Sequence, residues 1–360
     1  MKLDKKHQHQ LKLCISTRCN FCRRACPIYE VSGMEFDSPR AWLEVINEAI
    51  EGRVDSLEIM SLLNKCTLCR KCVGACPHGI ETPEIILDFK SRIRGEYIPE
   101  PIEILDKKGE IEVDREYRIK VAYPWIYVKN FILNANPLGE KPKKEGLIAD
   151  ADFVFFPGCI TNYKDKEVYE ACVKFFKKVG AKYSVINACC YSELKPLGFS
   201  VDEIRRLFEK RHPHLRGMKI VTPCAGCYHT LKEDHKLNVM HISELIYQHK
   251  NKIKRGIEGE VTLHDPCKLG RYHGKFQQSR EIIQQTGAKL VELRQNKKES
   301  HCCGGGGSLK YYYPQMQENV CENLIKLNEK KATIVTNCSY CKQTINKNTK
   351  QKAKHLIELI

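Results

Sequence analysis

The second half of the chain alternates between short apolar runs and longer amphipathic stretches. Four of the runs have the composition of buried strands, and each leads directly into a cysteine; they are DFVFFPGC, KIVTPCAGC, VTLHDPC and TIVTNCSYC. Between them, stretches such as KEVYEACVKFFKKVGA and QQSREIIQQTGAKL place apolar residues at helical spacing. This alternation of strand and helix, repeated once, predicts two α/β domains of one plan, at residues 149–258 and 259–360.

The first part of the chain has a different pattern. The segment SPRAWLEVINEAI has a serine that can cap a helix, followed by apolar residues at helical spacing, so residues 1–98 are predicted to form a small, mainly helical domain. Residues 99–148 mix Pro, Gly and Lys with strand-like pieces (YRIKVAYPWIYVK) before NPLGEKPKKEG, which indicates a connector. The predicted fold class is α+β with several domains.

Composition narrows the class of protein. The chain has 360 residues, of which 42% are hydrophobic, which is enough for two or three globular domains. No run approaches the roughly 20 apolar residues that cross a bilayer, and the opening MKLDKKHQHQ lacks the apolar core of an export signal. Twenty cysteines in a chain of this kind predict a cytoplasmic protein whose thiols bind metal rather than form disulfides.

The formal net charge of +16 has three interpretations. A basic surface can bind nucleic acid, or it can dock a partner or an anionic membrane. Alternatively, basic side chains can surround anionic iron–sulfur clusters, each of which carries a net charge of about minus one to minus three with four thiolate ligands. We favour the last interpretation and expect no nucleic-acid partner.

One block of cysteines is highly specific. It has the form C-x2-C-x2-C-x3-C-P, with cysteines at 66, 69, 72 and 76. In two-cluster ferredoxins the first three cysteines of such a run wrap one cluster, while the fourth ligates the other cluster. A zinc knuckle is the alternative, since C-x2-C also suits tetrahedral zinc, but zinc has no use for four cysteines followed by proline.

The block that precedes it is irregular. Cys19, Cys22 and Cys26 are in register with the ferredoxin pattern, but Ser16 stands where the first ligand is expected and the available thiol is Cys14. If Cys14 reaches, one cubane [4Fe-4S] cluster takes Cys14, Cys19, Cys22 and Cys76, and a second takes Cys66, Cys69, Cys72 and Cys26. If it does not, the first cluster has an exchangeable iron or only three irons.

The two α/β domains each contain five cysteines at matching spacing. In the first they are Cys159, Cys189, Cys190, Cys224 and Cys227; in the second they are Cys267, Cys302, Cys303, Cys338 and Cys341. Five thiolates are one too many for a cubane or a zinc site, and an adjacent pair most naturally serves two irons of an opened-out cluster. The glycines at 304–307 let the backbone approach such a cluster and offer N–H groups to its sulfur atoms.

With HDPCKLGR and HCCGGGG in the second copy, this repeat resembles the CCG domains of the catalytic subunit of methanogen-type heterodisulfide reductase. The N-terminal cysteine blocks and NPLGE in the connector are similar to the form of that enzyme in which the ferredoxin and catalytic parts share one chain. The same architecture also resembles the iron–sulfur subunits of glycolate, lactate and glycerol-3-phosphate dehydrogenases. The resemblance implies an N-terminal helical two-[4Fe-4S] ferredoxin domain, followed by a pseudo-twofold pair of α/β CCG domains.

It also implies that each cysteine quintet holds a non-cubane [4Fe-4S] cluster and that a disulfide is cleaved between the two clusters. Two positions depart from the family pattern: Tyr191 replaces the glycine expected after the first cysteine pair, and Lys268 stands where the family often has His. The spacing of 29 residues before Cys189 is also slightly short. These departures leave the cluster form in the first repeat open.

Several residues near these cysteines are candidates for a second role. His264, His229 and His301 could deliver a proton to a departing thiolate or could be structural hydrogen-bonding groups. Lys268 and Arg271 could bind an anionic group of a substrate or neutralise a cluster. The remaining two cysteines, Cys172 and Cys321, lie in helical patterns among apolar residues and are expected to be buried packing thiols.

The sequence thus predicts an iron–sulfur oxidoreductase that relays electrons through two cubane clusters to the paired non-cubane clusters, where a disulfide is reduced to thiols or formed from them. The alternative is an electron-transfer subunit of a flavin-dependent dehydrogenase, and a weaker one is a zinc-bearing scaffold. No flavin or nucleotide loop is recognisable, so an electron-donating partner is expected, either a flavoprotein or a membrane cytochrome b. Such a partner could hold the chain at the inner face of the membrane.

Overall fold

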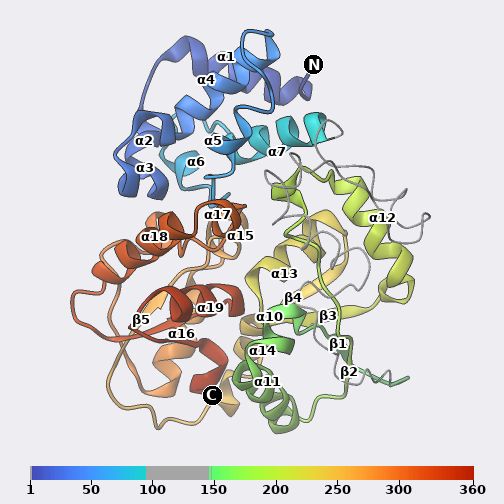
Figure 1. The fold of residues 1–360 in the computed structure, drawn as a ribbon. Coiled ribbons are helices and arrows are strands. Elements are labelled where there is room, and N and C mark those ends of the chain that lie inside the picture. Colours follow the sequence, from blue (N-terminus) through green and yellow to red (C-terminus); the bar gives the residue numbers. More distant parts are fainter. Residues whose placement is uncertain (1, 95–145, 147) are drawn as a thin grey trace. The chain divides into compact units, whose positions relative to one another are not determined.

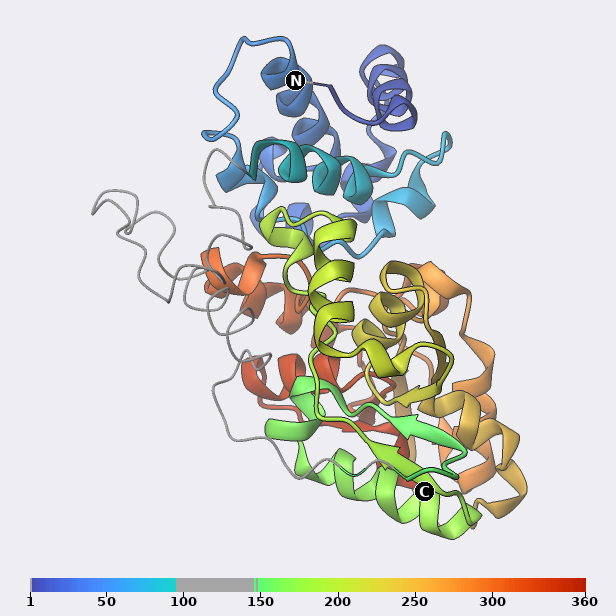
Figure 2. The same ribbon diagram turned by 90° about the vertical axis from the view of Figure 1, so that its right-hand side faces the viewer.

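The fold is a computed structural model that describes residues 2–94, 146 and 148–360. The predicted connector at 99–148, including NPLGE, lies outside the described residues except for 146 and 148. The chain divides into two compact units, and each contains segments that are far apart in the sequence. Both are shown in Figures 1 and 2.

The first unit is helical in its described part. It combines the N-terminal segment with Glu193–Leu207 and Gly306–Gln317. Its elements are α1 (Lys5–Thr17), α2 (Phe21–Ala25), α3 (Pro27–Ser32), η1 (Glu35–Asp37), α4 (Pro39–Ile50), α5 (Met60–Leu63), α6 (Lys71–Ala75), α7 (Thr82–Ile93), η3 (Lys195–Leu197) and α17 (Leu309–Tyr312). Two helices, α12 (Val201–Arg211) and α18 (Pro314–Lys326), begin in this unit.

The helix predicted from SPRAWLEVINEAI is α4. Ser38 caps it by accepting a hydrogen bond from the backbone N–H of Ala41, and Pro39 occupies the first turn, where no N–H partner is lost. Its buried face, which includes Trp42 and Ile46, packs against α1 and α7. The predicted helical character of this part of the chain is confirmed.

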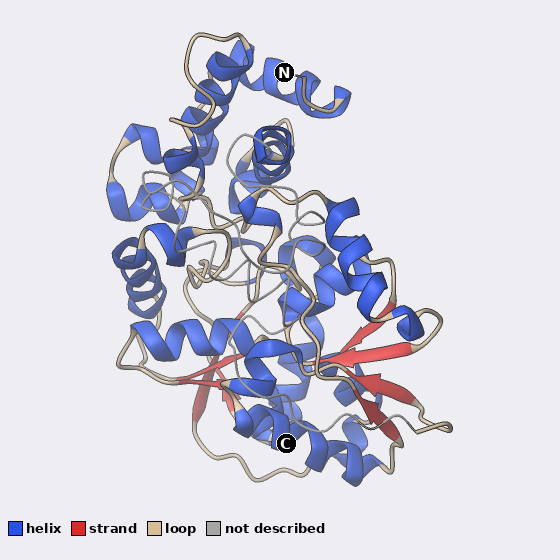
Figure 3. Cartoon of the chain, turned by 45° about the vertical axis from the view of Figure 1, so that its right-hand side comes forward, coloured by secondary structure: helices blue, strands red, loops and turns tan. Residues whose placement is uncertain are grey.

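The second unit contains two parallel sheets with the same strand order, β2-β1-β3-β4 and β6-β5-β7-β8, drawn red in Figure 3. The strands are β1 (Phe153–Phe155), β2 (Tyr183–Val185), β3 (Lys219–Thr222), β4 (Asn238–His241), β5 (Glu260–His264), β6 (Lys289–Leu290), β7 (Thr333–Thr336) and β8 (Ala353–His355). The helical elements are α10 (Gly158–Tyr163), α11 (Lys166–Val179), η4 (Pro213–Leu215), α13 (Ala225–His229), η5 (Thr230–Asp234), α14 (Ile242–Gln248), η6 (Lys250–Lys252), α15 (Gly270–His273), α16 (Gln277–Thr286), η7 (Lys297–Glu299), α19 (Ser339–Asn348) and η8 (Leu356–Leu359).

The central strands are apolar on both faces, as is usual where helices cover both sides of a parallel sheet. Val154 pairs with Ile220 in the first sheet, and Leu263 pairs with Val335 in the second. The repeated α/β plan predicted from the sequence is therefore confirmed as two parallel sheets of one topology.

Both sheets share one hydrophobic core. It contains Phe155 and Val221 from the first sheet together with Leu263 and Val335 from the second. The C-terminal η8 lies beside α11, as Figure 2 shows. The two α/β halves therefore form one folding body, while the four-part division at 1–98, 99–148, 149–258 and 259–360 remains a prediction.

Candidate functional site

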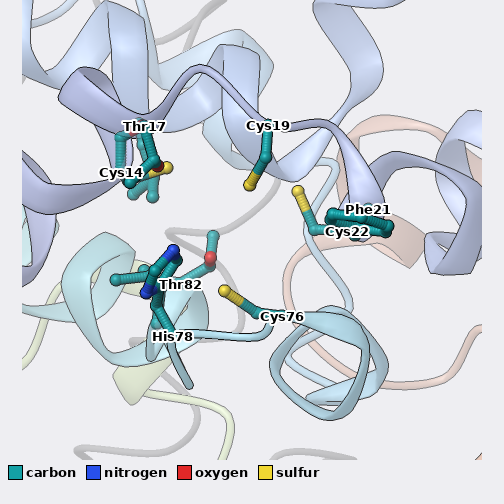
Figure 4. A pocket seen from close by; sticks show the side chains of 10 residues that line it. Cys14, Thr17, Cys19, Phe21, Cys22, Cys76, His78 and Thr82 are labelled. Atoms are coloured by element: carbon teal, nitrogen blue, oxygen red, sulfur yellow. The ribbon is translucent and has the colours of Figure 1, made fainter.

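In the first unit, four cysteines from two sequence blocks line one pocket. Cys14 is on the last turn of α1, Cys19 follows it in a turn, Cys22 is in α2, and Cys76 follows α6. Arg18 ends α1 in the left-handed conformation, with φ of 50°, and turns the chain toward Cys19. Figure 4 shows the sulfur atoms of Cys19, Cys22 and Cys76 around a common space, with Cys14 on its far side. The other lining residues are Thr17, Phe21, Leu43, His78, Ile80 and Thr82.

The charges of the other three thiols act on Cys14. Burial, together with charge repulsion from Cys22, Cys76 and Cys19, raises the pKa of Cys14 to about 12. Burial and the neighbouring Cys76 likewise raise the pKa of Cys22 to about 11. Such thiols stay protonated at neutral pH and become ligands when a metal displaces their protons.

The second set consists of Cys26, Cys66, Cys69 and Cys72, and all four are buried. The pKa of Cys72 is raised, first by burial and then by the charges of the other three. The chain turns tightly around Cys69: Leu68 and Arg70, on either side of it, adopt positive φ angles of 55° and 62°. The N–H of Leu68 donates to Cys66 Sγ at 3.4 Å.

A buried cation lies within electrostatic reach of this second set. Lys90 is 2% exposed, and its Nζ donates to Asn64 Oδ1 at 2.7 Å and to the carbonyl of Pro196 at 3.1 Å. Burial lowers its pKa to about 7, while the nearby Cys66 acts in the opposite direction. An anionic group bound by Cys66 would favour the ammonium form, because opposite charges stabilise each other in a poorly solvated site.

Two glycines of the predicted HCCGGGG motif pack against the second set. A Cβ at Gly306 would lie 2.3 Å from the carbonyl oxygen of Thr67, and one at Gly307 would lie 2.0 Å from that of Cys66. Only glycine therefore fits at these two positions. Gly306 and Gly307, which belong to the first unit, therefore pack closely on the Cys66 loop.

In the second unit, the five cysteines of the first repeat form a continuous string of thiols. Cys189 interacts with both Cys159 and Cys190, Cys190 in turn with Cys227, and Cys227 with Cys224. These thiols come from α10, from the loop after β2, from the turn after β3 and from α13. The structure thus brings the whole quintet together.

Four cysteines of the second repeat form a similar string. Cys302 interacts with Cys303, and Cys303 Sγ lies 3.4 Å from Cys341 Sγ. Cys341 interacts with Cys338. The fifth, Cys267, precedes α15 and is half-buried.

The two strings meet at one contact. Cys224 Sγ of the first repeat lies 3.9 Å from Cys338 Sγ of the second. Both residues directly precede a helix at the carboxyl end of a central strand, β3 and β7, which places equivalent thiols of the two repeats face to face. This contact joins the two strings of thiols across the two halves.

Tyr191 occupies the same backbone conformation as the glycine it replaces. Its φ is 61°, and that of Gly304 at the equivalent position is 80°. The N–H of Tyr191 donates to Cys189 Sγ at 3.3 Å, as the N–H of Gly304 does to Cys302 Sγ at 3.3 Å. The departure from the family pattern therefore leaves the local loop geometry intact.

The predicted polar candidates are held by hydrogen bonds. His264 is buried, with Nδ1 3.1 Å from Thr336 Oγ1 and Nε2 3.2 Å from the carbonyl of His301. Arg271 donates to the carbonyl of Ser300 at 2.6 Å. Their predicted roles toward substrate or protons stay predictions.

Lys268 and His301 are likewise engaged. Lys268 Nζ is 3.6 Å from the centroid of the Tyr272 ring, a cation–π contact. His301 is fully buried, and its Nδ1 lies 2.9 Å from the carbonyl of Cys302.

Sequence reasoning missed a histidine pair that joins the repeats. His229, two residues after Cys227, has its Nδ1 3.2 Å from Nε2 of His273. Glu233 approaches the other nitrogen of His273 at 3.8 Å. No spacing rule relates residues so distant in the sequence, so the pair could be found only in the folded chain.

The remaining observations concern metal binding and the membrane. Cys172 and Cys321 are fully buried, as expected for packing thiols. Within the described residues, no three His, Cys, Asp or Glu side chains are arranged to hold a single metal ion, so the case for metal rests on the convergence of all-thiol sets. Among the helices that the structure describes, none combines the length and apolar character of a membrane span.

Comparison with known proteins follows the same division of the chain. A model described as a 4Fe-4S dicluster domain matches residues 10–80, and one described as a cysteine-rich domain (CCG) matches twice, at 153–232 and 261–346. These matches define the class: an iron–sulfur protein that joins a dicluster domain to two cysteine-rich domains. The chain belongs with the iron–sulfur electron-transfer subunits related to heterodisulfide reductase.

Individual relatives support that placement. One subunit of the dihydromethanophenazine:CoB–CoM heterodisulfide reductase of Methanosarcina mazei is 27% identical over 91% of this chain and 87% of its own length. One subunit of the fumarate reductase (CoM/CoB) of Methanothermobacter marburgensis is 27% identical over 99% of this chain and 73% of its own. The glycolate oxidase iron–sulfur subunit of Escherichia coli is 36% identical over 19% of this chain and 17% of its own. No solved structure gives a significant match.

Proposed function

We propose that this chain reduces a small disulfide to two thiols, or forms it from them, with electrons relayed from a partner subunit. The observation that carries the proposal is the contact between Cys224 and Cys338, because it brings a buried cysteine of each quintet together. A disulfide bound there would have each sulfur beside a different quintet. Its reduction takes two electrons and two protons and yields two thiols.

The residues fit the groups that this reaction needs. We assign two cubane [4Fe-4S] clusters to the N-terminal sets, Cys14, Cys19, Cys22 with Cys76, and Cys26 with Cys66, Cys69 and Cys72. We assign two non-cubane [4Fe-4S] clusters to the quintets that begin at Cys159 and Cys267. Such clusters, when bound, supply one-electron transfer at each position, and all-thiolate donor sets are the ones that iron–sulfur clusters require.

The protein's own residues would hold the clusters, shield them from water and balance their negative charge. Burial of the second N-terminal set excludes water from it, and Lys90 places beside it an amine that an anionic group would hold in the charged form. Arg40, which donates to the carbonyl of Cys19 at 2.9 Å, lowers the pKa of Cys14 against the effect of burial. Basic side chains around anionic groups also account for part of the net charge of +16.

The partner is an electron-donating subunit, either a flavoprotein or a membrane cytochrome b, and the chain works in a hetero-oligomer. The relatives named above are themselves subunits, which supports this assembly. A cytochrome partner would place the chain at the inner face of the membrane.

A second candidate function is electron transfer alone, as a subunit of a flavin-dependent 2-hydroxyacid or glycerol-3-phosphate dehydrogenase. The short match to the glycolate oxidase iron–sulfur subunit favours it. In that case no thiol would bind at the quintets.

The test is anaerobic purification, iron and sulfide counting, and EPR under oxidising conditions with and without small thiols. Four four-iron clusters predict about 16 irons per chain and a signal that changes when thiol is added. Cys303→Ala should remove the thiol response, and Cys321→Ala, which replaces a buried thiol outside the sets, should keep it. About 8 irons with no thiol response would leave electron transfer alone as the function.

A further inference from the structure

The two N-terminal thiol sets differ in their exposure to solvent. Cys19, Cys22 and Cys76 of the first set are partly exposed, whereas Cys26, Cys66, Cys69 and Cys72 of the second are buried. Electron transfer slows steeply with distance. An external carrier should therefore transfer electrons to the partly exposed first set faster than to the buried second set. The pocket of that set also opens beside two exposed side chains, Phe21 and His78.

Three large apolar side chains are exposed in this part of the first unit, and one of them, Phe21, lines the pocket. Phe21, Met34 and Phe36 have exposed fractions of 64%, 61% and 66%, which are the highest among the large hydrophobic residues described. They lie on α2 and at η1, which are joined by the ion pair of Arg23 with Glu35 at 2.6 Å. Exposed Phe and Met beside Arg are the composition of a protein interface centre.

The charges of the first 60 residues fall into two blocks along the sequence. Residues 2–34, which contain Cys14, Cys19 and Cys22, carry seven Lys or Arg and two Asp or Glu. Residues 35–60 carry the reverse, seven Asp or Glu and two Arg. Arg18 and Arg24 are exposed and lie one and two residues from the lining residues Cys19 and Cys22, so they form a basic rim beside the opening.

We propose that Phe21, Met34 and Phe36 with their basic rim form the docking surface for an acidic electron-carrier protein, which delivers electrons at the Cys14–Cys76 set. The proposal rests on the proposed function, since it assumes a cluster at that set. A basic rim attracts an acidic partner over roughly 10 Å at moderate salt and speeds its encounter, while the apolar centre holds the complex. An anionic lipid surface would satisfy the same charge pattern but would bring no electrons.

The experiment measures how fast the loaded full-length chain is reduced. A reduced acidic two-cluster bacterial ferredoxin serves as the probe carrier, and dithionite serves as a small reductant that needs no docking. Met34→Ser with Phe36→Ser should slow reduction by ferredoxin at least about tenfold, as the loss of central interface contacts does, and leave reduction by dithionite unchanged. Ile148→Ser, which replaces a side chain 53% exposed elsewhere, is the matched control and should have no effect.

The charge component is tested separately. Arg24→Glu should slow reduction by ferredoxin at low salt and weaken its dependence on ionic strength, whereas Lys354→Glu, at an exposed basic residue of the second unit, should change neither. EPR spectra of each variant before mixing show that its clusters are intact.

Three results would overturn the docking surface. The serine variants could accept electrons from ferredoxin as fast as the wild type, or ferredoxin could fail to reduce a wild type that dithionite reduces. If the serine variants lost binding to vesicles of anionic phospholipid but were still reduced by ferredoxin at the wild-type rate, the surface would bind lipid rather than an electron carrier. A wild type that holds no iron after anaerobic purification would refute the proposed function rather than this surface.

Discussion

Tyr191 shows how a cysteine loop accommodates a residue other than glycine. Tyr191 adopts a left-handed backbone, which costs a non-glycine residue about 1–2 kcal/mol. Its ring is 1% exposed, and its hydroxyl accepts a hydrogen bond from Arg211 at 3.1 Å, so burial and the hydrogen bond offset the strain. The sequence showed that Tyr191 departs from the glycine pattern, but only the backbone angle shows that the loop is nonetheless the same.

Gly306 provides a test at this scale. Gly306→Ala would place a methyl group 2.3 Å from the carbonyl oxygen of Thr67, and because backbone cannot move aside cheaply we expect a loss of about 2–3 kcal/mol in unfolding free energy. Thermal unfolding of the apoprotein measures the loss.

Gly256 supplies the matched control for that substitution. A Cβ there would meet nothing within 4 Å, so Gly256→Ala should leave stability nearly unchanged. Equal stability of the two variants would show that the packing of Gly306 on the Cys66 loop is not as described.

At the scale of elements, the sequence was most informative where one local pattern dictates one structure. The apolar runs before Cys159, Cys224, Cys267 and Cys338 became β1, β3, β5 and β7, since buried parallel strands need continuous apolar residues. The spacing of the N-terminal cysteines likewise predicted which thiols converge, because short loops leave the chain few alternatives.

Other features depend on contacts between distant segments and could not be predicted locally. Residues 193–207 and 306–317 follow the two cysteine pairs in sequence but pack with the N-terminal helices. The fourth strands, by contrast, carried a signal that was missed: each ends in His-x-x-Glu, at His241 and at His355, and each histidine caps the next helix.

These histidine caps predict sensitivity to acid. His355 Nδ1 accepts from the N–H of Ile357 at 3.2 Å, and its Nε2 lies 2.9 Å from the carbonyl of Pro223, so the folded protein needs the neutral ring. Burial lowers its pKa to about 4, from 6.5 when unfolded. The unfolded chain therefore binds more protons between these values, and about 3 kcal/mol of stability that is present above pH 6.5 is lost as pH falls toward 4.

Replacement of the ring isolates this effect. His355→Asn keeps a cap acceptor without a titrating group and should flatten the dependence of unfolding free energy on pH between 6.5 and 4, as measured by urea unfolding. His214→Asn, at an exposed histidine of the same unit, should leave the slope as it is. An unchanged slope in His355→Asn would contradict the assignment.

At the scale of the whole molecule, each of the two N-terminal cysteine blocks places one cysteine with the other block. Cys76 joins the pocket of Cys14, Cys19 and Cys22, and the charges of Cys69 and Cys66 act on Cys26. We therefore expect Cys26→Ser to remove the same EPR signal as Cys66→Ser, and Cys76→Ser to remove the same signal as Cys14→Ser.

Combination of the substitutions sharpens that prediction. Cys26→Ser with Cys66→Ser should lose no more iron than either alone, because residues that act on one site are not additive. Cys172→Ala, at a buried thiol outside the sets, should retain all signals. Loss of different signals on Cys26→Ser and Cys66→Ser would mean that each block binds its own cluster.

The string of thiols that runs from Cys159 to Cys341 has a consequence for the protein before it receives its iron. The Cys303 and Cys341 sulfur atoms are 3.4 Å apart, and a covalent S–S bond of about 2 Å is within reach of a small side-chain movement. Molecular oxygen and iron would then compete for the same atoms. Newly made chains should thus be sensitive to oxidation by air until they have bound iron. The presence of a thiol reductant during reconstitution should determine what fraction of the chains can bind it.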